Sequence, residues 1–274
     1  MSIATLMTLI ALAVLFAAGL FAWRGRRGIG YRVRRFLGRD QPRYPIVLVH
    51  GLLGFAKVAR VEYFRGVRAS LKRRGIEVIS VTLPPVGSIE DRARSLAEQL
   101  SSVEGKVNVV AHSMGGLDAR YAIAHLGLHV KVASLVTIGT PHHGTPVANF
   151  GASAVQHLGL RGAARLLGVD VAALEDLRPK GLSLFNESTP DAQGVFYGSI
   201  VGEAKEVAHP LLKASKLLLP RLASDGLVPT ESQRWGMVLR EVEADHWAQI
   251  GWSSSFDAIA LYEELSCELS WRGF

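Results

Sequence analysis

The sequence contains a single cysteine, Cys267, so an intrachain disulfide cannot form. This is typical of a protein from a reducing compartment. No histidine or second cysteine lies near Cys267, which we therefore expect to be a packed helix residue and not a reactive thiol. The sequence also lacks internal repeats and low-complexity segments, and its 274 residues are enough for one large domain with a buried core.

Charged side chains are missing from residues 1–23, and the sequence from Ile3 to Trp23 is almost continuously apolar. A helix of this length spans a bilayer core of about 30 Å. A cleaved signal peptide usually begins with Lys or Arg, has a shorter apolar stretch and ends at a small-residue cleavage site, and none of these features is clear here. We therefore expect a transmembrane anchor over residues 1–23, with a cleaved signal peptide as the alternative.

Acidic residues are almost missing from residues 24–43, which carry eight arginines against the single aspartate Asp40. This segment accounts for the whole net charge of +7, because residues 44–274 carry 23 basic and 23 acidic side chains. The neutral main domain argues against nucleic-acid binding, and a basic linker of this kind suits anionic lipid headgroups. Since the arginines follow the apolar segment, the positive-inside rule places the main domain on the cytoplasmic face, with the extracytoplasmic side as the alternative.

From residue 44 onward, short β-branched runs alternate with longer amphipathic stretches. We expect strands at Ile46–His50, Ile76–Thr82, Lys106–Ala111, Val132–Ile138, Val195–Val201 and Met237–Val242, and helices at Val58–Arg74, Ser88–Val103, Met114–Leu126 and Asp257–Leu269. This alternation predicts an α/β fold, a mostly parallel central sheet with helices on both faces. Between about residues 143 and 193 the alternation of strands and helices stops, and the sequence has a helical pattern throughout. This predicts an insertion within the domain at 44–274.

The strongest local signal is Ala111-His112-Ser113-Met114-Gly115-Gly116, placed where an expected strand runs into an expected helix. A nucleophile elbow holds its serine on a sharp strand-to-helix turn and requires small residues two positions before and after it. Ala111 and Gly115 fill those positions. We therefore predict that Ser113 is the nucleophile of a serine hydrolase built on the α/β-hydrolase fold.

A serine nucleophile needs a histidine base, and the histidine needs a carboxylate that orients it. In α/β-hydrolases the three residues follow in the order Ser, Asp or Glu, His. Only His246 lies beyond the candidate acids, in the loop after the last expected strand. For the acid we favour Asp225, in a turn bounded by glycine and proline, over Asp245, whose side chain is expected to point away from its neighbour and to cap or solvate the loop.

The developing charge on a substrate carbonyl needs two backbone N–H donors, one after the nucleophile and one in the loop after the first strand. We expect these donors at Met114 and Leu52. His50 is expected to brace the oxyanion loop without taking a proton. The other histidines near the motifs, His112, His142 and His143, are expected to lie outside the triad.

Four motifs in this order resemble the bacterial triacylglycerol lipases of the Pseudomonas and Burkholderia type. The motifs are Tyr44–Gly54, Val109–Gly116, Thr137–Gly144 and Ser224–Pro229, within residues 44–265. The resemblance implies hydrolysis of carboxylic esters, with long-chain acyl esters as substrates. It also implies a helical lid at lipid interfaces, and the insertion stands where that lid is expected.

Two features depart from the family. Its members place a calcium-ligating aspartate two residues after the catalytic histidine, where this chain has Ala248, so we expect no metal there and no cofactor. Family members are usually secreted, and many carry a disulfide, whereas this chain is expected to be anchored. An endogenous membrane lipid then becomes a candidate substrate.

The expected triad leaves two other functions open. A thioesterase or acyltransferase could use the same residues, because the fold does not determine the acyl acceptor. The third hypothesis is a membrane scaffold that has the fold but no catalytic activity. The presence of every expected triad residue in the right order disfavours it. The sequence predicts neither the oligomeric state nor a protein partner.

Overall fold

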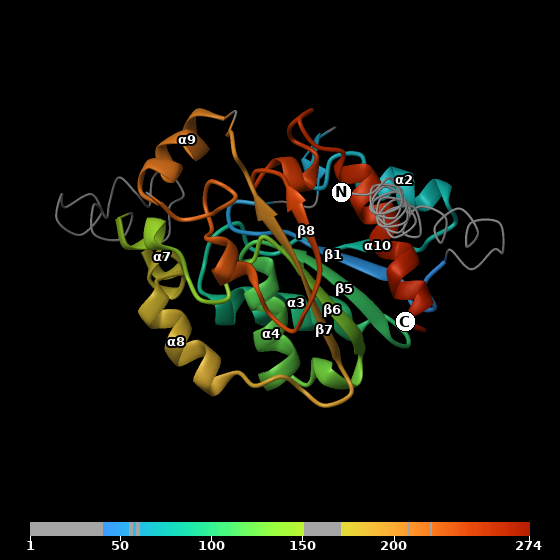
Figure 1. The fold of residues 1–274 in the computed structure, drawn as a ribbon. Helices are drawn as coiled ribbons and strands as arrows, with labels where there is room; N and C mark the ends of the chain where they lie inside the picture. Colours follow the sequence, from blue (N-terminus) through green and yellow to red (C-terminus); the bar gives the residue numbers. More distant parts are fainter. Residues whose placement is uncertain (1–40, 55–56, 59–60, 151–170, 208, 220) are drawn as a thin grey trace, which may run out of the picture.

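A six-stranded parallel sheet forms the centre of the domain in the computed structural model, which describes residues 41–54, 57–58, 61–150, 171–207, 209–219 and 221–274. The strands lie in the order β4-β1-β5-β6-β7-β8 (Figure 1). Their bounds are β1 Ile46–Val49, β4 Val78–Ser80, β5 Val107–His112, β6 Val132–Ile138, β7 Phe196–Glu203 and β8 Met237–Glu243. Every neighbouring pair in this sheet is parallel, as expected from the sequence.

Helices cover both faces of the sheet because successive side chains of a strand point to opposite faces. On β1, Ile46 and Leu48 pack toward α2 (Val67–Arg73) and α10 (Ala258–Trp271). Val47 and Val49 belong to the other face, which α3 (Ile89–Ser101) and α4 (Gly115–His125) cover. The strands are buried on both sides, which explains their continuous β-branched runs.

Several helix ends agree with their sequence signals. The Ser88 side chain accepts a hydrogen bond from the Asp91 N–H at the start of α3, and the Asp257 side chain accepts one from Ala260 at the start of α10. Gly127 follows α4 with a φ of 74°, a left-handed conformation that glycine adopts without strain. Cys267 is buried within α10, as expected of a packing residue.

The helix expected at Val58–Arg74 is wrong over its first half. A short hairpin, β2 (Lys57–Val58) and β3 (Val61–Glu62), stands there instead, and α2 begins only at Val67. Gly66 precedes that helix with a φ of 74°, which a continuous helix does not allow. Tyr63 and Phe64 are buried from this non-helical stretch, so their apolar pattern does not come from a helix face.

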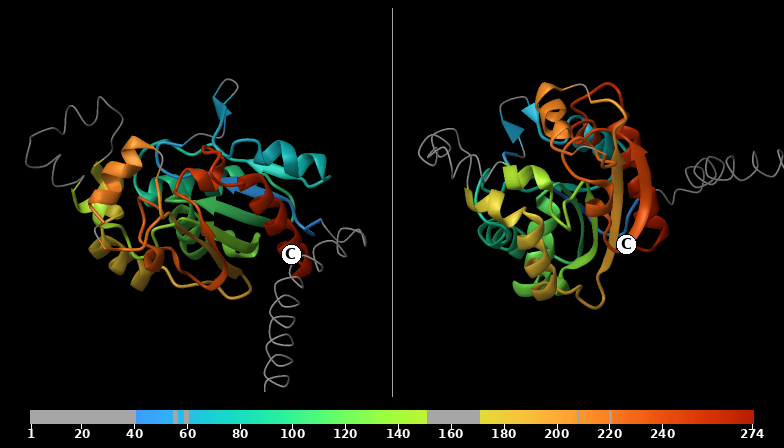
Figure 2. Two further views of the ribbon diagram at one scale, coloured as in Figure 1. Left: turned by 45° about the horizontal axis from the view of Figure 1, so that its top comes forward. Right: turned by 60° about the vertical axis from the view of Figure 1, so that its left-hand side comes forward.

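The expected insertion is helical where the structure describes it. It contains α7 (Val171–Asp176) and α8 (Pro179–Ser188), and the apolar residues Ala173, within α7, and Leu177, directly after it, are buried. A further helix that was not predicted, α9 (Pro210–Leu217), precedes the motif at Ser224–Pro229. Figures 1 and 2 show α7 and α9 near each other at the end of the domain toward which the strand arrows point.

The anchor expected at residues 1–23 and the basic segment up to Asp40 lie outside the described residues. Within the described part of the chain, no helix is long and apolar enough to cross a membrane.

Candidate active site

The predicted nucleophile Ser113 follows β5 and precedes α4, and its backbone has a φ of 55°. Only two other non-glycine residues of the described chain, Leu53 and Arg221, have a positive φ. Such a conformation costs about 1 kcal/mol or more and persists where the surroundings impose it. Here the Thr140 hydroxyl donates a hydrogen bond of 2.7 Å to the Ser113 carbonyl, which helps to hold the turn.

The structure brings the three predicted triad residues together from separate parts of the sequence. His246 Nε2 lies 3.0 Å from Ser113 Oγ, and His246 Nδ1 lies 2.7 Å from Asp225 Oδ2. The His246 N–H also donates to the Asp225 carbonyl, which joins the two loops through their backbones. His246 and Asp225 are buried. A serine hydroxyl, an imidazole and a carboxylate in this order can transfer a proton away from the serine.

The Asp225 carboxylate accepts hydrogen bonds at both oxygens. Oδ1 accepts from the N–H groups of Leu227 and Val228, and Oδ2 accepts from the Gln249 amide at 3.2 Å in addition to His246. Several donors on one carboxylate fix its orientation. Gln249 was not identified from the sequence, since it belongs to no motif.

The alternative acid, Asp245, points elsewhere. Its Oδ1 accepts from the N–H groups of Trp247 and Ala248, at 3.0 and 2.8 Å, and so caps the short 3-10 helix at Ala248–Ile250. Among the described residues, the carboxylate that hydrogen-bonds to the His246 ring is that of Asp225 and not that of Asp245. The geometry therefore selects Asp225 as the partner of His246.

The predicted oxyanion donors flank the nucleophile. Met114 directly follows Ser113, and Leu52 lies in the loop after β1. Among the described residues, neither backbone N–H group has an internal hydrogen-bond acceptor, so both N–H groups are available to a ligand. The loop of Leu52 approaches the elbow closely, because a Cβ added at Gly51 would lie 2.7 Å from Ser113 Cβ.

His50 braces this loop, as expected. The Leu83 N–H donates to its Nε2 at 3.0 Å, so Nδ1 carries the proton and donates to the Gly51 carbonyl at 2.9 Å. Burial, reinforced by the charge of Arg92 and opposed by the bond to Gly51, lowers the pKa of His50 to about 4. The imidazole is therefore uncharged at pH 7 and supports the loop through its two hydrogen bonds.

A buried ion pair supports the same loop from beneath. The Arg92 guanidinium contacts Asp118 Oδ2 at 2.8 Å, donates to the His50 carbonyl at 2.9 Å, and also donates to the Pro84 carbonyl. Burial raises the pKa of Asp118 to about 7, and Arg92 opposes this rise. Arg92 thus links the oxyanion loop to α4, the helix that begins just after Ser113.

The remaining motif histidines lie outside the triad. His142 is buried, with Nε2 3.0 Å from the Thr137 hydroxyl, and its ring stacks on Trp235. His143 is exposed. Burial, together with the nearby charge of Arg120, lowers the pKa of His142 well below its usual value. His112 is also buried, and its Nε2 lies 3.0 Å from the His246 carbonyl.

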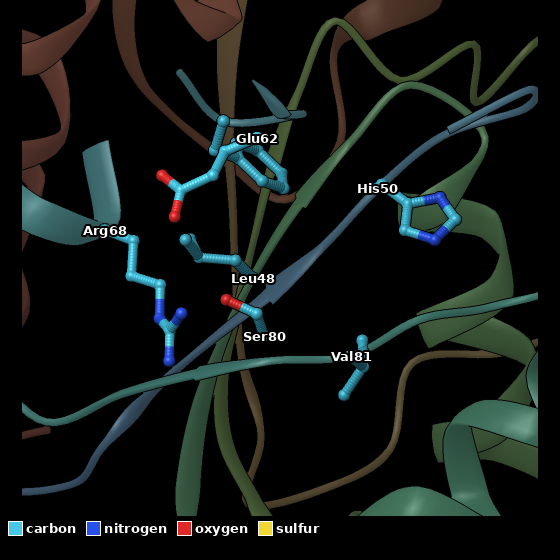
Figure 3. Close-up of a pocket in the computed structure, with 7 residues that line it drawn as sticks. Leu48, His50, Glu62, Arg68, Ser80 and Val81 are labelled. Atoms are coloured by element: carbon cyan, nitrogen blue, oxygen red, sulfur yellow. The ribbon is translucent and has the colours of Figure 1, made fainter. Parts of the chain in front are cut away.

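Two hollows in the described part of the chain do not include Ser113. The first lies beside His50 and is lined by polar side chains that include Glu62 and Arg68 (Figure 3). Its volume of about 10 Å³ leaves room for about one water molecule, so no acyl chain fits. The second, of about 220 Å³, lies along β7 and β8 and is walled by charged residues, which do not suit an apolar ligand: Glu203, Lys205, Arg234, Glu241 and Glu243.

A family model described as "Alpha/beta hydrolase family" matches residues 46–262. The chain belongs to this family. It is 31% identical to a triacylglycerol lipase of Vibrio cholerae, over 97% of this chain and 98% of that protein. It is also 31% identical to triacylglycerol lipase 2 of Saccharomyces cerevisiae, over 73% of this chain and 65% of the yeast protein, and 39% identical to a triacylglycerol lipase of Burkholderia plantarii, over 39% of this chain and 32% of that protein.

Among solved structures, the mature lipase BlEst2 of Bacillus licheniformis superposes with a TM-score of 0.68 at 22% identity, over 83% of this chain and 92% of the other. This likeness supports the fold. The resemblance to bacterial triacylglycerol lipases of the Pseudomonas and Burkholderia type, found from the motifs, is confirmed by the relatives.

The buried neutral histidines predict acid lability. Burial lowers the pKa of His50, His112 and His142 in the folded state, so below pH about 6.5 these three side chains bind more protons in the unfolded chain than in the native one. The three histidines therefore leave the free energy of unfolding unchanged above that pH and lower it as the pH falls. The raised pKa of Asp118 acts in the opposite direction and offsets at most one of the three. We expect the free energy of unfolding to drop between pH about 7 and about 5, by up to about 1.4 kcal/mol per pH unit for each histidine.

Urea unfolding at both pH values measures this slope, and His142→Gln is expected to reduce it by one histidine's share. The exposed His129 provides the matched control, since His129→Gln should leave the slope unchanged. A free energy of unfolding that stays constant over the range contradicts the interpretation.

Proposed function

We propose that Ser113, His246 and Asp225 form the catalytic triad of a lipase or esterase that hydrolyses carboxylic esters of lipids. The observation that carries the proposal is the continuous hydrogen-bonded series from Ser113 Oγ through both nitrogens of His246 to Asp225 Oδ2, at 3.0 and 2.7 Å. The order of the three residues and the family membership of the chain support it.

The reaction proceeds through an acyl-enzyme. Ser113 Oγ attacks the ester carbonyl while His246 Nε2 takes the serine proton, and Asp225 stabilises the resulting imidazolium. The N–H groups of Leu52 and Met114 hold the oxyanion. The tetrahedral intermediate collapses, His246 returns the proton to the departing alcohol, and water then attacks the acyl-enzyme by the same route and releases the acid.

The surroundings of the oxyanion donors suit an acyl chain. Met114 belongs to an apolar cluster with Leu117, Ala173 and Leu182, and Leu52 packs against it. These cluster residues of α4, α7 and α8 have no exposed surface, so an acyl chain would contact the cluster through partly exposed members such as Leu52. A long-chain lipid ester gains from such contacts, whereas a small polar ester does not.

We further propose that residues 1–23 anchor the enzyme in a membrane and that residues 24–43 lie at its anionic surface, with the catalytic domain on the cytoplasmic side. The uncharged apolar segment and the eight arginines that follow it support this arrangement. The substrate is then a lipid ester of the same membrane.

Replacing the nucleophile tests the triad. Ser113→Ala is expected to abolish hydrolysis of a p-nitrophenyl ester in a protein that remains folded, and Asp225→Asn is expected to lower kcat by about 10³- to 10⁴-fold. The control is Asp245→Asn, whose remaining side-chain oxygen can still accept the bonds from Trp247 and Ala248, so it should retain activity. Activity retained by Ser113→Ala contradicts the proposal.

A panel of short esters, long triglycerides, phospholipids and acyl-CoA then identifies the substrate class and separates a lipase from a thioesterase.

A chelator tests the departure from the family at Ala248. Methyl side chains do not ligate calcium, and Asp245 Oδ1 is already engaged with two N–H groups. We expect EDTA to leave the initial rate of ester hydrolysis unchanged. Strong inhibition by EDTA that added calcium reverses contradicts the expectation.

Protease protection tests the orientation. The full-length protein, expressed in bacterial cells with a C-terminal tag, should stay with the membrane pellet after alkaline carbonate washing. Protease added outside spheroplasts should leave its catalytic domain intact and should digest it after lysis. Digestion from outside before lysis places the domain on the other face.

A further inference from the structure

Two buried polar side chains beside the triad take no part in the proton transfers described above. Tyr63 follows β3 and is 9% exposed, and His112 ends β5, directly before Ser113, with no exposed surface. They lie 49 residues apart in the sequence and meet through a hydrogen bond of 2.8 Å between Tyr63 Oη and His112 Nδ1. Neither residue belongs to the triad or to the oxyanion hole.

The direction of each hydrogen bond around this pair follows from the groups involved. The His246 carbonyl can only accept, so His112 Nε2, 3.0 Å away, is the donor. A neutral imidazole has one N–H group, which leaves His112 Nδ1 to accept the Tyr63 O–H. The Tyr63 oxygen then accepts the Gly51 N–H, at 3.3 Å.

These bonds form one directed series that joins three loops. It starts at Gly51, the neighbour of the oxyanion donor Leu52, and passes through the residue that precedes the nucleophile. It ends at the backbone of His246, the base. The series therefore connects every part of the proposed site except the acid.

We propose that Tyr63 and His112 are positioning residues that hold the base and the oxyanion loop at a set separation on either side of Ser113. The proposal rests on the triad proposed above and adds residues that act through its backbone. Burial and the nearby His246 lower the pKa of His112 well below its usual value, and burial raises the pKa of Tyr63. Both groups thus keep their protons through the working pH range, so the brace is static while His246 gains and loses its proton.

Such a brace acts on the transition state more than on substrate binding. Misplacement of a base or an oxyanion donor by about 1 Å can lower the rate up to about 10²-fold, while the apolar contacts that bind the acyl chain remain. The predicted signature is a lower kcat at an unchanged KM.

The tyrosine hydroxyl can be removed with a matched control in the same core. Tyr63→Phe keeps the ring, which packs on Phe64, and removes the hydroxyl that links Gly51 to His112. Tyr262 is buried in the same apolar cluster and also packs on Phe64, and its hydroxyl has no hydrogen-bond partner among the described residues. Tyr262→Phe therefore removes the same atom from the same core without breaking a hydrogen bond.

Steady-state kinetics on a p-nitrophenyl ester, with thermal unfolding of each variant, measure the effect. We expect Tyr63→Phe to lower kcat about tenfold with KM within about twofold of the parent, and Tyr262→Phe to change neither. A kcat of Tyr63→Phe equal to that of Tyr262→Phe overturns the proposal, and so does a change confined to KM.

A second pair of variants covers the case in which Tyr63→Phe unfolds. His112→Gln keeps a donor and an acceptor, whereas His112→Met has similar bulk, no donor and only a weak sulfur acceptor. The glutamine variant is expected to retain at least about tenfold more kcat than the methionine variant, and equal values overturn the proposal. Activity that remains after Ser113→Ala would refute the proposed triad itself. Failure of the positioning proposal and failure of the triad are therefore distinguishable.

Discussion

The left-handed backbone of Ser113 depends on the two glycines that follow it. A Cβ at Gly115 would lie 2.7 Å from the His50 carbonyl oxygen, and one at Gly116 would lie 2.8 Å from Thr137 Cγ2. Without side chains at these positions, α4 approaches the ends of β1 and β6 closely enough to place the Met114 N–H beside the loop of Leu52. The close packing of the first turn of α4 therefore contributes both to the conformation of Ser113 and to the geometry of the proposed oxyanion hole.

Buried polar groups behind this turn make the close packing specific. The ion pair of Arg92 and Asp118 has no exposed surface, and desolvation makes such a pair a poor source of stability. Its guanidinium instead satisfies the carbonyls of His50 and Pro84, which the approach of α4 removes from water. A loop with satisfied carbonyls keeps its N–H groups aimed at the site, so the pair serves the geometry of the site more than the stability of the fold.

The sequence predicts those features whose causes are local or ordered along the chain. The strand Val132–Ile138 has the expected bounds, because a fully buried parallel strand is a continuous β-branched run. The members of the triad were identified from a strand–helix junction and from their order. The stretch before α2 was assigned wrongly, since Tyr63 and Phe64 have apolar spacing but pack into the core from the non-helical segment between β3 and α2. Gln249 could not be predicted either, because its contact with Asp225 joins residues 24 apart that share no motif.

The apolar cluster beside the nucleophile couples the insertion to the chemistry. Leu177 and Leu182, from the end of α7 and from α8, pack with Met114, and Leu52 lies against the same cluster. Met114 thus shares its apolar surroundings with the described part of the insertion, and Leu52 packs against the same cluster. The loop of Leu52 is also held by Arg92 and His50. The position of the proposed oxyanion donors therefore depends on packing from the insertion as well as on the polar contacts of Arg92 and His50.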